Sequence, residues 1–271
     1  MVAGLMFDCT PLVYALGILS AFGGGFIDAI AGGGGLVTMP ALLISGVPPH
    51  MALGCNKVSA CLGTCTALGN FARSGLVRWR VALAGVAFSL LGSSAGSQMA
   101  LRLDPAILGK LLVALLPIAM CAVLLPPRGN RRASTRAASP FPQHGIRFLL
   151  PVTLVCLTIG FYDGFFGPGT GSFLILTFHW VLRMELMEAS ATAKVLNLAS
   201  NLSSTLVFIY GGVVLWRLAL PMAVACCLGN WLGSRMAIRI GSAAVRRFLT
   251  ISLSLLLLTL VWQYFLAPLL H

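Results

Sequence analysis

Long apolar runs separated by short polar gaps cover most of this chain and limit what it can fold into. Hydrophobic residues make up 58% of the 271 residues and charged residues only 9%, whereas a soluble domain carries roughly a quarter charged residues. A chain this apolar requires lipid as its solvent. At about 20 apolar residues per crossing, it is expected to be an all-α polytopic membrane protein with about 8 to 10 membrane segments. The apolar runs fall at 11–31, 35–46, 51–72, 80–101, 106–126, 147–166, 170–182, 189–210, 217–238 and 244–266.

The net charge of +12 arises from basic residues that lie in the gaps between the apolar runs. Such placement is typical of cytoplasmic loops under the positive-inside rule, and it argues against nucleic acid as a partner. The one long polar stretch, 127–146, is expected to be a cytoplasmic linker between a first transmembrane repeat, 1–126, and a second, 147–271. The linker contains Arg128, Arg131, Arg132 and Arg136.

The two halves of the chain match each other in sequence. Asp28 matches Asp163 at an offset of 135, and the same offset joins Gly32-Gly33-Gly34 to Gly167-Pro168-Gly169. After a two-residue insertion the offset becomes 137, and it then holds through charged and aromatic positions, which chance similarity between apolar helices would not do. The later matches include Lys57 with Lys194, Gly75 with Gly212, Trp79 with Trp216 and Arg80 with Arg217.

Loop charge indicates how the two repeats are oriented. The loop with Arg73, Arg78 and Arg80 is basic, whereas its counterpart holds only Arg217. In the next pair of matched loops the bias is reversed, because here the loop of the second half is the more basic one. It carries Arg235, Arg239, Arg246 and Arg247. Opposite bias in matched loops favours an inverted pair of repeats, with five crossings each and both termini outside. The alternative is a parallel pair with four crossings each, in which the short runs 35–46 and 170–182 re-enter the membrane.

Four ionisable residues stand out inside the apolar runs: Asp28, Lys57, Asp163 and Lys194. Charges at this depth are expensive, so they normally face a bundle interior or a water-filled path and find partners. Two readings follow. In the first, Asp–Lys bridges only hold the repeats together. In the second, which we favour, these residues belong to a transport site, because each lies within a few residues of glycine-broken or polar helix sequence.

Depth along the helices predicts which of these charges pair. Asp163 lies 16 residues from Arg147, or about 24 Å at 1.5 Å per residue, and Lys57 is equally far from Arg73. If both arginines mark the inner face, Lys57 and Asp163 share the outer half of the membrane. Symmetry then places Asp28 and Lys194 in the inner half. The sequence therefore predicts cross-repeat pairs, Lys57–Asp163 and Asp28–Lys194.

Glycine clusters interrupt one helix in each half, at 32–35 and 167–171. Glycine runs are costly in a continuous helix, and the short apolar runs that follow them would begin with unpaired N–H groups, which favour anions. Broken helices at matched positions of two repeats are typical of the midplane substrate sites of secondary transporters. Close helix packing through small residues is the alternative. The candidate substrate donors are Gly33, Gly34, Gly35, Gly169, Thr170 and Gly171.

Polar stripes accompany both lysines. Asn197 and Asn201 follow Lys194 at helical spacing, with Thr205 one turn further. Lys57 heads a weaker stripe with Cys61 and Thr64, and Asn56 beside it adds an amide. A lysine with amide and hydroxyl neighbours suits an oxyanion, so the lysines and these three asparagines are candidate substrate ligands. The small-residue faces at Gly92 and Gly96, and at Gly229 and Gly233, are expected to pack helices together.

The paired motifs resemble those of the sulfite exporter TauE/SafE permeases, also called the toluene sulfonate uptake family. Gly25-Phe-Ile-Asp-Ala-Ile-Ala-Gly-Gly-Gly-Gly-Leu-Val-Thr-Met-Pro40, followed by Asn56-Lys57, is similar to the family's first motif. Gly160-Phe-Tyr-Asp-Gly-Phe-Phe-Gly-Pro-Gly-Thr-Gly171 with Ala193-Lys194-Val-Leu-Asn197 is similar to the second. The resemblance implies a multi-pass permease of the bacterial inner membrane that carries a sulfur oxyanion or an organosulfonate such as sulfoacetate.

These observations predict a secondary transporter of a small anionic sulfur compound that works by alternating access. Asp28 or Asp163 would couple transport to a proton, because a buried carboxylate readily takes up a proton near neutral pH. An anion channel on the same repeats is the alternative. The four histidines lie in or near loops without a catalytic arrangement, and the eight cysteines lack metal-ligand spacing, so we expect no enzyme, cofactor or metal. The expected partners are the anion and the lipid bilayer, with a homodimer as an open alternative.

Overall fold

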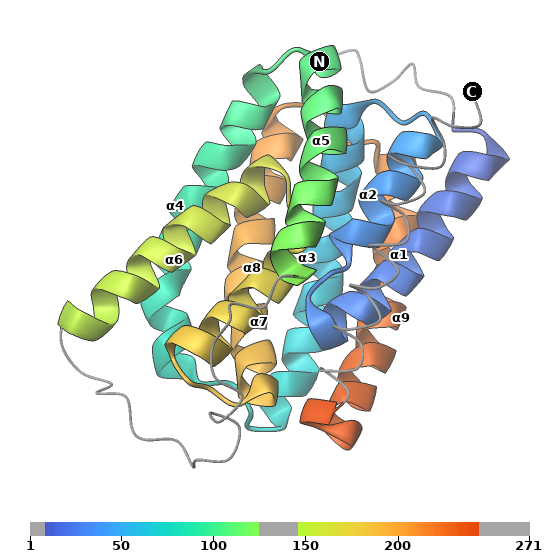
Figure 1. The fold of residues 1–271 in the computed structure, drawn as a ribbon. Coiled ribbons are helices and arrows are strands. Elements are labelled where there is room, and N and C mark those ends of the chain that lie inside the picture. Colours follow the sequence, from blue (N-terminus) through green and yellow to red (C-terminus); the bar gives the residue numbers. More distant parts are fainter. Residues whose placement is uncertain (1–8, 125–145, 244–271) are drawn as a thin grey trace.

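A computed structural model describes residues 9–124 and 146–243, which fold into a bundle of α-helices (Figure 1). The expectation of an all-α protein is confirmed for these residues, which contain no strand. Residues 127–145 of the expected linker and the last apolar run, 244–266, lie outside this part of the chain. The helices are α1 (Pro11–Ala31), α2 (Gly35–Ile44), α3 (Pro49–Arg73), α4 (Trp79–Arg102), α5 (Pro105–Leu124), α6 (Ile146–Phe165), α7 (Thr170–Val181), α8 (Leu186–Tyr210) and α9 (Trp216–Ile240).

Both predicted glycine breaks are present. Helix α1 ends where Gly32 adopts φ 76°, and the N–H of Gly32 donates to the carbonyl oxygen of Asp28. Between α6 and α7, Gly167 and Gly169 have φ values of 95° and 85°. These left-handed conformations suit glycine because it has no Cβ to clash with the backbone. The chain therefore leaves helical geometry at the two places that the glycine clusters indicated.

The short helices turn back beside the helices that precede them. A methyl group added to Gly24 in α1 would lie 2.9 Å from Cγ2 of Thr38 in α2, so the two helices run alongside each other in opposite directions. Figure 1 shows the same reversal between α6 and α7. With 10 and 12 residues, α2 and α7 are about 15 and 18 Å long, well short of a hydrocarbon core of about 30 Å. The left-handed glycines thus reverse the chain at both breaks, and the number of crossings per repeat stays a prediction.

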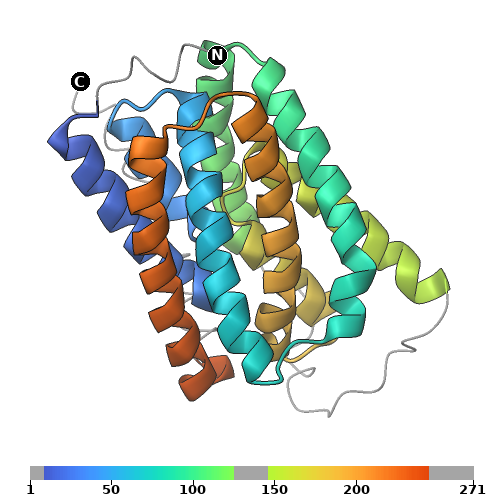
Figure 2. The ribbon, with the colours of Figure 1, turned by 180° about the vertical axis from the view of Figure 1, so that it is seen from behind.

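Helices α9, α3, α8 and α4 lie side by side in one layer (Figure 2). Helix α3 runs antiparallel to α8: Cys55, near the start of α3, contacts Leu215 just after α8. At the other end, the main-chain N–H of Arg78, just after α3, donates to Thr192 Oγ1 near the start of α8. Helix α1 packs along α9 and α6 packs along α4, so each half of the chain supports the other.

The small-residue faces bring these helices into close contact. A methyl group added to Gly96 in α4 would lie 2.1 Å from the carbonyl oxygen of Phe161 in α6. The matched methyl at Gly233 in α9 would lie 2.4 Å from the carbonyl oxygen of Phe26 in α1. The packing role expected for these faces is confirmed, and it occurs between the halves rather than within them.

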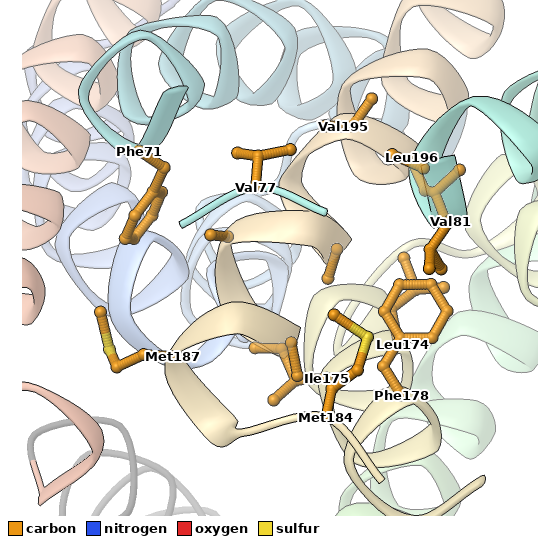
Figure 3. Close-up of a cluster of buried hydrophobic side chains, with 14 of the residues drawn as sticks. Phe71, Val77, Val81, Leu174, Ile175, Phe178, Met184, Met187, Val195 and Leu196 are labelled. Atoms are coloured by element: carbon orange, nitrogen blue, oxygen red, sulfur yellow. The ribbon is translucent and has the colours of Figure 1, made fainter. Parts of the chain in front are cut away.

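Two clusters of buried apolar side chains form the core. Figure 3 shows part of one, in which Phe71, Val77 and Val81 meet side chains of α7 and α8. The second cluster contains residues matched to these three at the offset of 137, namely Phe208, Val214 and Leu218. The two halves therefore build similar cores from matched positions.

Helix α8 of the central layer turns polar side chains inward and exposes Leu202 and Leu206. On α8, Asn201 is 3% exposed, whereas Leu206 on the opposite face is 48% exposed. Within residues 9–124 and 146–243, α1 and α4 are long and apolar enough to cross a membrane. Helices α3 and α8 are less apolar because they carry the buried lysine and amide residues of the candidate site.

Candidate functional site

The four charged residues of the apolar runs form two ion pairs, and each pair joins the two halves of the chain. Lys57 Nζ of α3 lies 2.8 Å from Asp163 Oδ1 of α6. Lys194 Nζ of α8 lies 2.7 Å from Asp28 Oδ2 of α1. Both cross-repeat pairings predicted from helix depth are therefore confirmed. The roles of these residues in transport stay predictions.

The two pairs differ in their access to the outside. The side chains of Lys57 and Asp163 are 1% and 2% exposed. Lys194 is equally buried at 1%, but its partner Asp28 is 14% exposed. A buried charge is tolerated only with a partner, because the solvation it loses is worth several kcal/mol. The pairing thus explains how the interior of an apolar bundle holds four charged groups.

Lys57 has a second acceptor, which comes from the other half. The amide oxygen Oδ1 of Asn201 accepts from Lys57 Nζ over 3.2 Å. The Nδ2 of Asn201 in turn donates to Oδ1 of Asn197, also over 3.2 Å. The sequence placed this amide stripe beside Lys194 on the same helix, but the stripe faces α3 and serves Lys57. The predicted ligands Lys57, Asn197 and Asn201 are therefore brought together.

Lys194 is tied to the first glycine break. Besides the carboxylate of Asp28, its ammonium group donates to the main-chain carbonyl oxygen of the same residue. That carbonyl also accepts from the N–H of Gly32 over 2.8 Å. The second lysine thus holds the end of α1 at the point where the helix breaks.

The two breaks meet in the middle of the molecule. The N–H of Ser172 in α7 donates to the carbonyl oxygen of Gly32 over 3.1 Å, and its hydroxyl donates to that of Ala31 over 2.7 Å. A methyl group added to Gly171 would lie 2.5 Å from Cα of Gly32. One added to Gly35 would lie 3.0 Å from Cα of Pro168. The starts of α2 and α7 are therefore adjacent, as a shared site requires.

The predicted backbone donors are only partly available in this conformation. The main-chain contact between Gly32 and Ser172 occupies one N–H in the first turn of α7. The hydroxyl of Thr170 donates back to the carbonyl oxygen of Gly167 over 2.6 Å. Gly33, Gly34 and Gly169 lie buried in the breaks themselves. An anion bound between the helix starts would require the two breaks to separate.

Asn56 is buried, and it has a partner that the sequence did not reveal. The hydroxyl of Thr38 in α2 donates to Asn56 Oδ1 over 2.5 Å. On the matching side, Tyr162 donates its hydroxyl to the carbonyl oxygen of Pro168 over 2.6 Å. Thr38 and Tyr162 both lie within six residues of a break in sequence, which is the one signal that could have identified them.

The ammonium groups and amides at this centre suit an oxyanion. Each lysine is neutralised by a carboxylate here, so an incoming anion would compete with a carboxylate for the lysine. Gly167 lets Lys57 approach the break, since a methyl group there would lie 3.0 Å from its Nζ. Across residues 9–124 and 146–243, no three His, Cys, Asp or Glu residues come together in a way that would hold a metal ion.

Comparison with known proteins identifies the family. The sulfite exporter TauE/SafE family model matches residues 17–260. A "Probable membrane transporter protein" of Haemophilus influenzae is 38% identical over 245 residues, which cover 90% of this chain and 91% of that protein. The "Probable membrane transporter protein YfcA" of Escherichia coli K12 is 35% identical over 247 residues, covering 91% and 88%. No solved structure matches the chain. This chain therefore belongs to the sulfite exporter TauE/SafE family of membrane transporters.

Proposed function

We propose that this protein is a secondary transporter of a small anionic sulfur compound in the bacterial inner membrane, working by alternating access. The observation that carries the proposal is the pair of cross-repeat ion pairs, Lys57–Asp163 and Asp28–Lys194, beside two touching helix breaks. Intramembrane ionisable residues mark substrate pathways. Paired broken helices at matched positions mark the binding region of secondary transporters.

The chemistry at this centre favours an anion. A lysine ammonium is a compact positive charge with three donors, and Asn201 adds a neutral amide beside Lys57. The starts of α2 and α7 add the positive ends of two helix dipoles. We assign the binding site to Lys57, Lys194, Asn56, Asn197, Asn201 and the residues at the two helix starts. Membership of the TauE/SafE family supports sulfite, sulfoacetate or another organosulfonate as the substrate.

We further propose that the halves form an inverted repeat. The matched helices α3 and α8 run in opposite directions, as the contacts of Cys55 and Arg78 require. The opposite charge bias of matched loops also supports an inverted repeat. Two inverted halves can exchange conformations, so a site between them opens first to one side and then to the other.

The test is uptake by the purified protein in proteoliposomes. Radiolabelled sulfite, thiosulfate, sulfoacetate and taurine are compared with and without a pH gradient. We expect saturable uptake of at least one of these compounds and a loss of at least tenfold in the Lys57→Met and Lys194→Met variants. The matched control is Arg78→Gln, which removes one exposed positive charge from the Arg78–Glu188 pair outside the site.

Two outcomes would contradict the proposal. A flux that rises linearly with substrate and never saturates would favour an anion channel on the same scaffold. Uptake that persists in both lysine variants would show that these two lysines do not form the binding site.

A further inference from the structure

The two carboxylates of the candidate site are not equivalent. Asp163 is 2% exposed, and its Oδ1 binds Lys57. Its other oxygen, Oδ2, is buried and has no hydrogen-bond partner in the part of the chain that the structure describes. Asp28 is 14% exposed and can therefore be solvated in part. Oδ2 is therefore an oxygen of Asp163 that could take a proton without breaking any hydrogen bond that the structure shows.

The two lysines differ in a matching way. Lys57 is also held by Asn201 Oδ1 at 3.2 Å, so it can leave Asp163 and remain anchored in the site. The acceptors of Lys194 both belong to Asp28, one in the side chain and one in the main chain. Movement of Lys194 away from Asp28 would therefore break both contacts and its link to the break at Gly32. Lys57 is thus the lysine that can exchange a carboxylate for a substrate anion.

Such an exchange leaves Asp163 buried and unpaired. A lone carboxylate in this setting is strongly disfavoured, and a group in that position neutralises itself by binding a proton. We propose that Asp163, and not Asp28, carries the proton that is transported with the anion. This inference rests on the proposed transport function and assigns one part of it to one residue.

Among residues 9–124 and 146–243, the cation in contact with Asp163 is Lys57. Lys57 reaches Asp163 from α3, and the neutral Asn201 of α8 contacts Lys57. On α6 itself, Tyr162 is adjacent, and its hydroxyl is used by Pro168. The other charged or imidazole groups on the described helices that pack against α6 lie near helix ends or in the second ion pair: Arg80, Arg102, His179, Glu188 and Lys194.

The charge balance follows from this exchange. The empty site holds an ammonium and a carboxylate, which together are neutral. In the loaded site the ammonium binds a monovalent anion and the carboxyl group holds one proton from the bulk solution, which is again neutral. One proton therefore accompanies one anion, and neither the empty nor the loaded form carries net charge across the membrane. A gradient of one pH unit would support about tenfold accumulation, because one unit corresponds to 1.36 kcal/mol.

The experiment compares Asp163→Asn with Asp28→Asn in proteoliposomes. Two quantities are measured with the anion that the wild-type protein transports: exchange of labelled for unlabelled anion, and accumulation driven by a pH gradient of one unit. We expect Asp163→Asn to exchange the anion more slowly and to lose the tenfold accumulation, because exchange requires no net movement of protons. Asp28→Asn is expected to transport more slowly yet to keep the accumulation ratio. Glu188→Gln, in the partly exposed Arg78–Glu188 pair, is the control.

A second measurement follows the proton directly. Anion is added to detergent-solubilised protein in weak buffer that contains a pH indicator. We expect the wild type and Asp28→Asn each to take up about one proton from the solution per bound anion. If Asp163→Asn does not fold, Asp28→Asn decides the question alone. Loss of both accumulation and proton uptake in a folded Asp28→Asn protein would overturn the inference. Failure of the wild-type protein to transport any of the four compounds would instead contradict the proposed function.

Discussion

The N–H of Ser172 in α7 donates to the carbonyl oxygen of Gly32 over 3.1 Å, which joins the two glycine breaks main chain to main chain. The contact is possible because neither Gly32 nor Gly171 carries a Cβ. It closes the space between the starts of α2 and α7, where backbone donors would otherwise meet an anion. Separation of these two backbones is therefore the movement that admits a substrate in the proposed mechanism.

Replacing Gly171 by alanine should disturb this contact. The added methyl group would lie 2.5 Å from Cα and 2.7 Å from the carbonyl oxygen of Gly32, and backbone cannot give way as a side chain can. Overpacking of this kind typically costs about 1–3 kcal/mol. We expect a clearly lower melting temperature in detergent together with loss of uptake. Gly69→Ala is the control, because a methyl group there meets no atom within 4 Å; an equal loss in both variants would contradict the role of the contact.

The buried pair Lys57–Asp163 should matter far more for stability than an exposed pair. Lys57→Met leaves a carboxylate buried without its partner, which typically costs about 3–5 kcal/mol. The double variant Lys57→Met/Asp163→Asn removes both charges, and most of that loss should return, although transport should not. Thermal unfolding of the two single variants and the double variant measures the coupling. The same cycle at Arg78 and Glu188, whose side chains are 55% and 24% exposed, should give less than about 1 kcal/mol.

Charge reversal tests which residues are partners. Exchanging the two charges of one pair, as in Lys57→Asp/Asp163→Lys, should restore folding and part of the activity that each single change abolishes. The corresponding swap within the first half, Asp28→Lys/Lys57→Asp, should not, because these two residues do not pair with each other. Expression and uptake of all the variants are compared. Rescue confined to the swap within one half would contradict the observed pairing.

The charged part of the site was predictable from sequence because charges are rare in the apolar runs. Helix depth, measured from Arg73 and Arg147 at 1.5 Å per residue, was sufficient to pair Lys57 with Asp163 across the halves. The course of the chain after each break was not predictable in the same way. An apolar helix has the same composition whether it crosses or turns back, and the direction depends on φ at Gly32 and Gly167.

Contacts between distant segments account for the other differences. Asn201 shares a helix face with Lys194, yet it binds Lys57, because Lys194 extends toward Asp28 on α1. The bond from Thr38 to Asn56 joins positions 18 residues apart on different helices. Spacing within one helix identifies which residues share a face, but it does not identify what that face meets.

The opposite orientation of the halves can be tested with cysteines at two matched positions. Arg73 at the end of α3 and Tyr210 at the end of α8 are both exposed, Tyr210 at 90%. Arg73→Cys and Tyr210→Cys are introduced separately into a variant that lacks the eight native cysteines. If α3 and α8 cross the membrane in opposite directions, a membrane-impermeant maleimide should label Tyr210→Cys in intact cells. It should label Arg73→Cys only in inverted vesicles, since the basic loop after α3 belongs inside. Labelling of both positions from the same side would show that the halves are parallel and would remove the structural basis for alternating access.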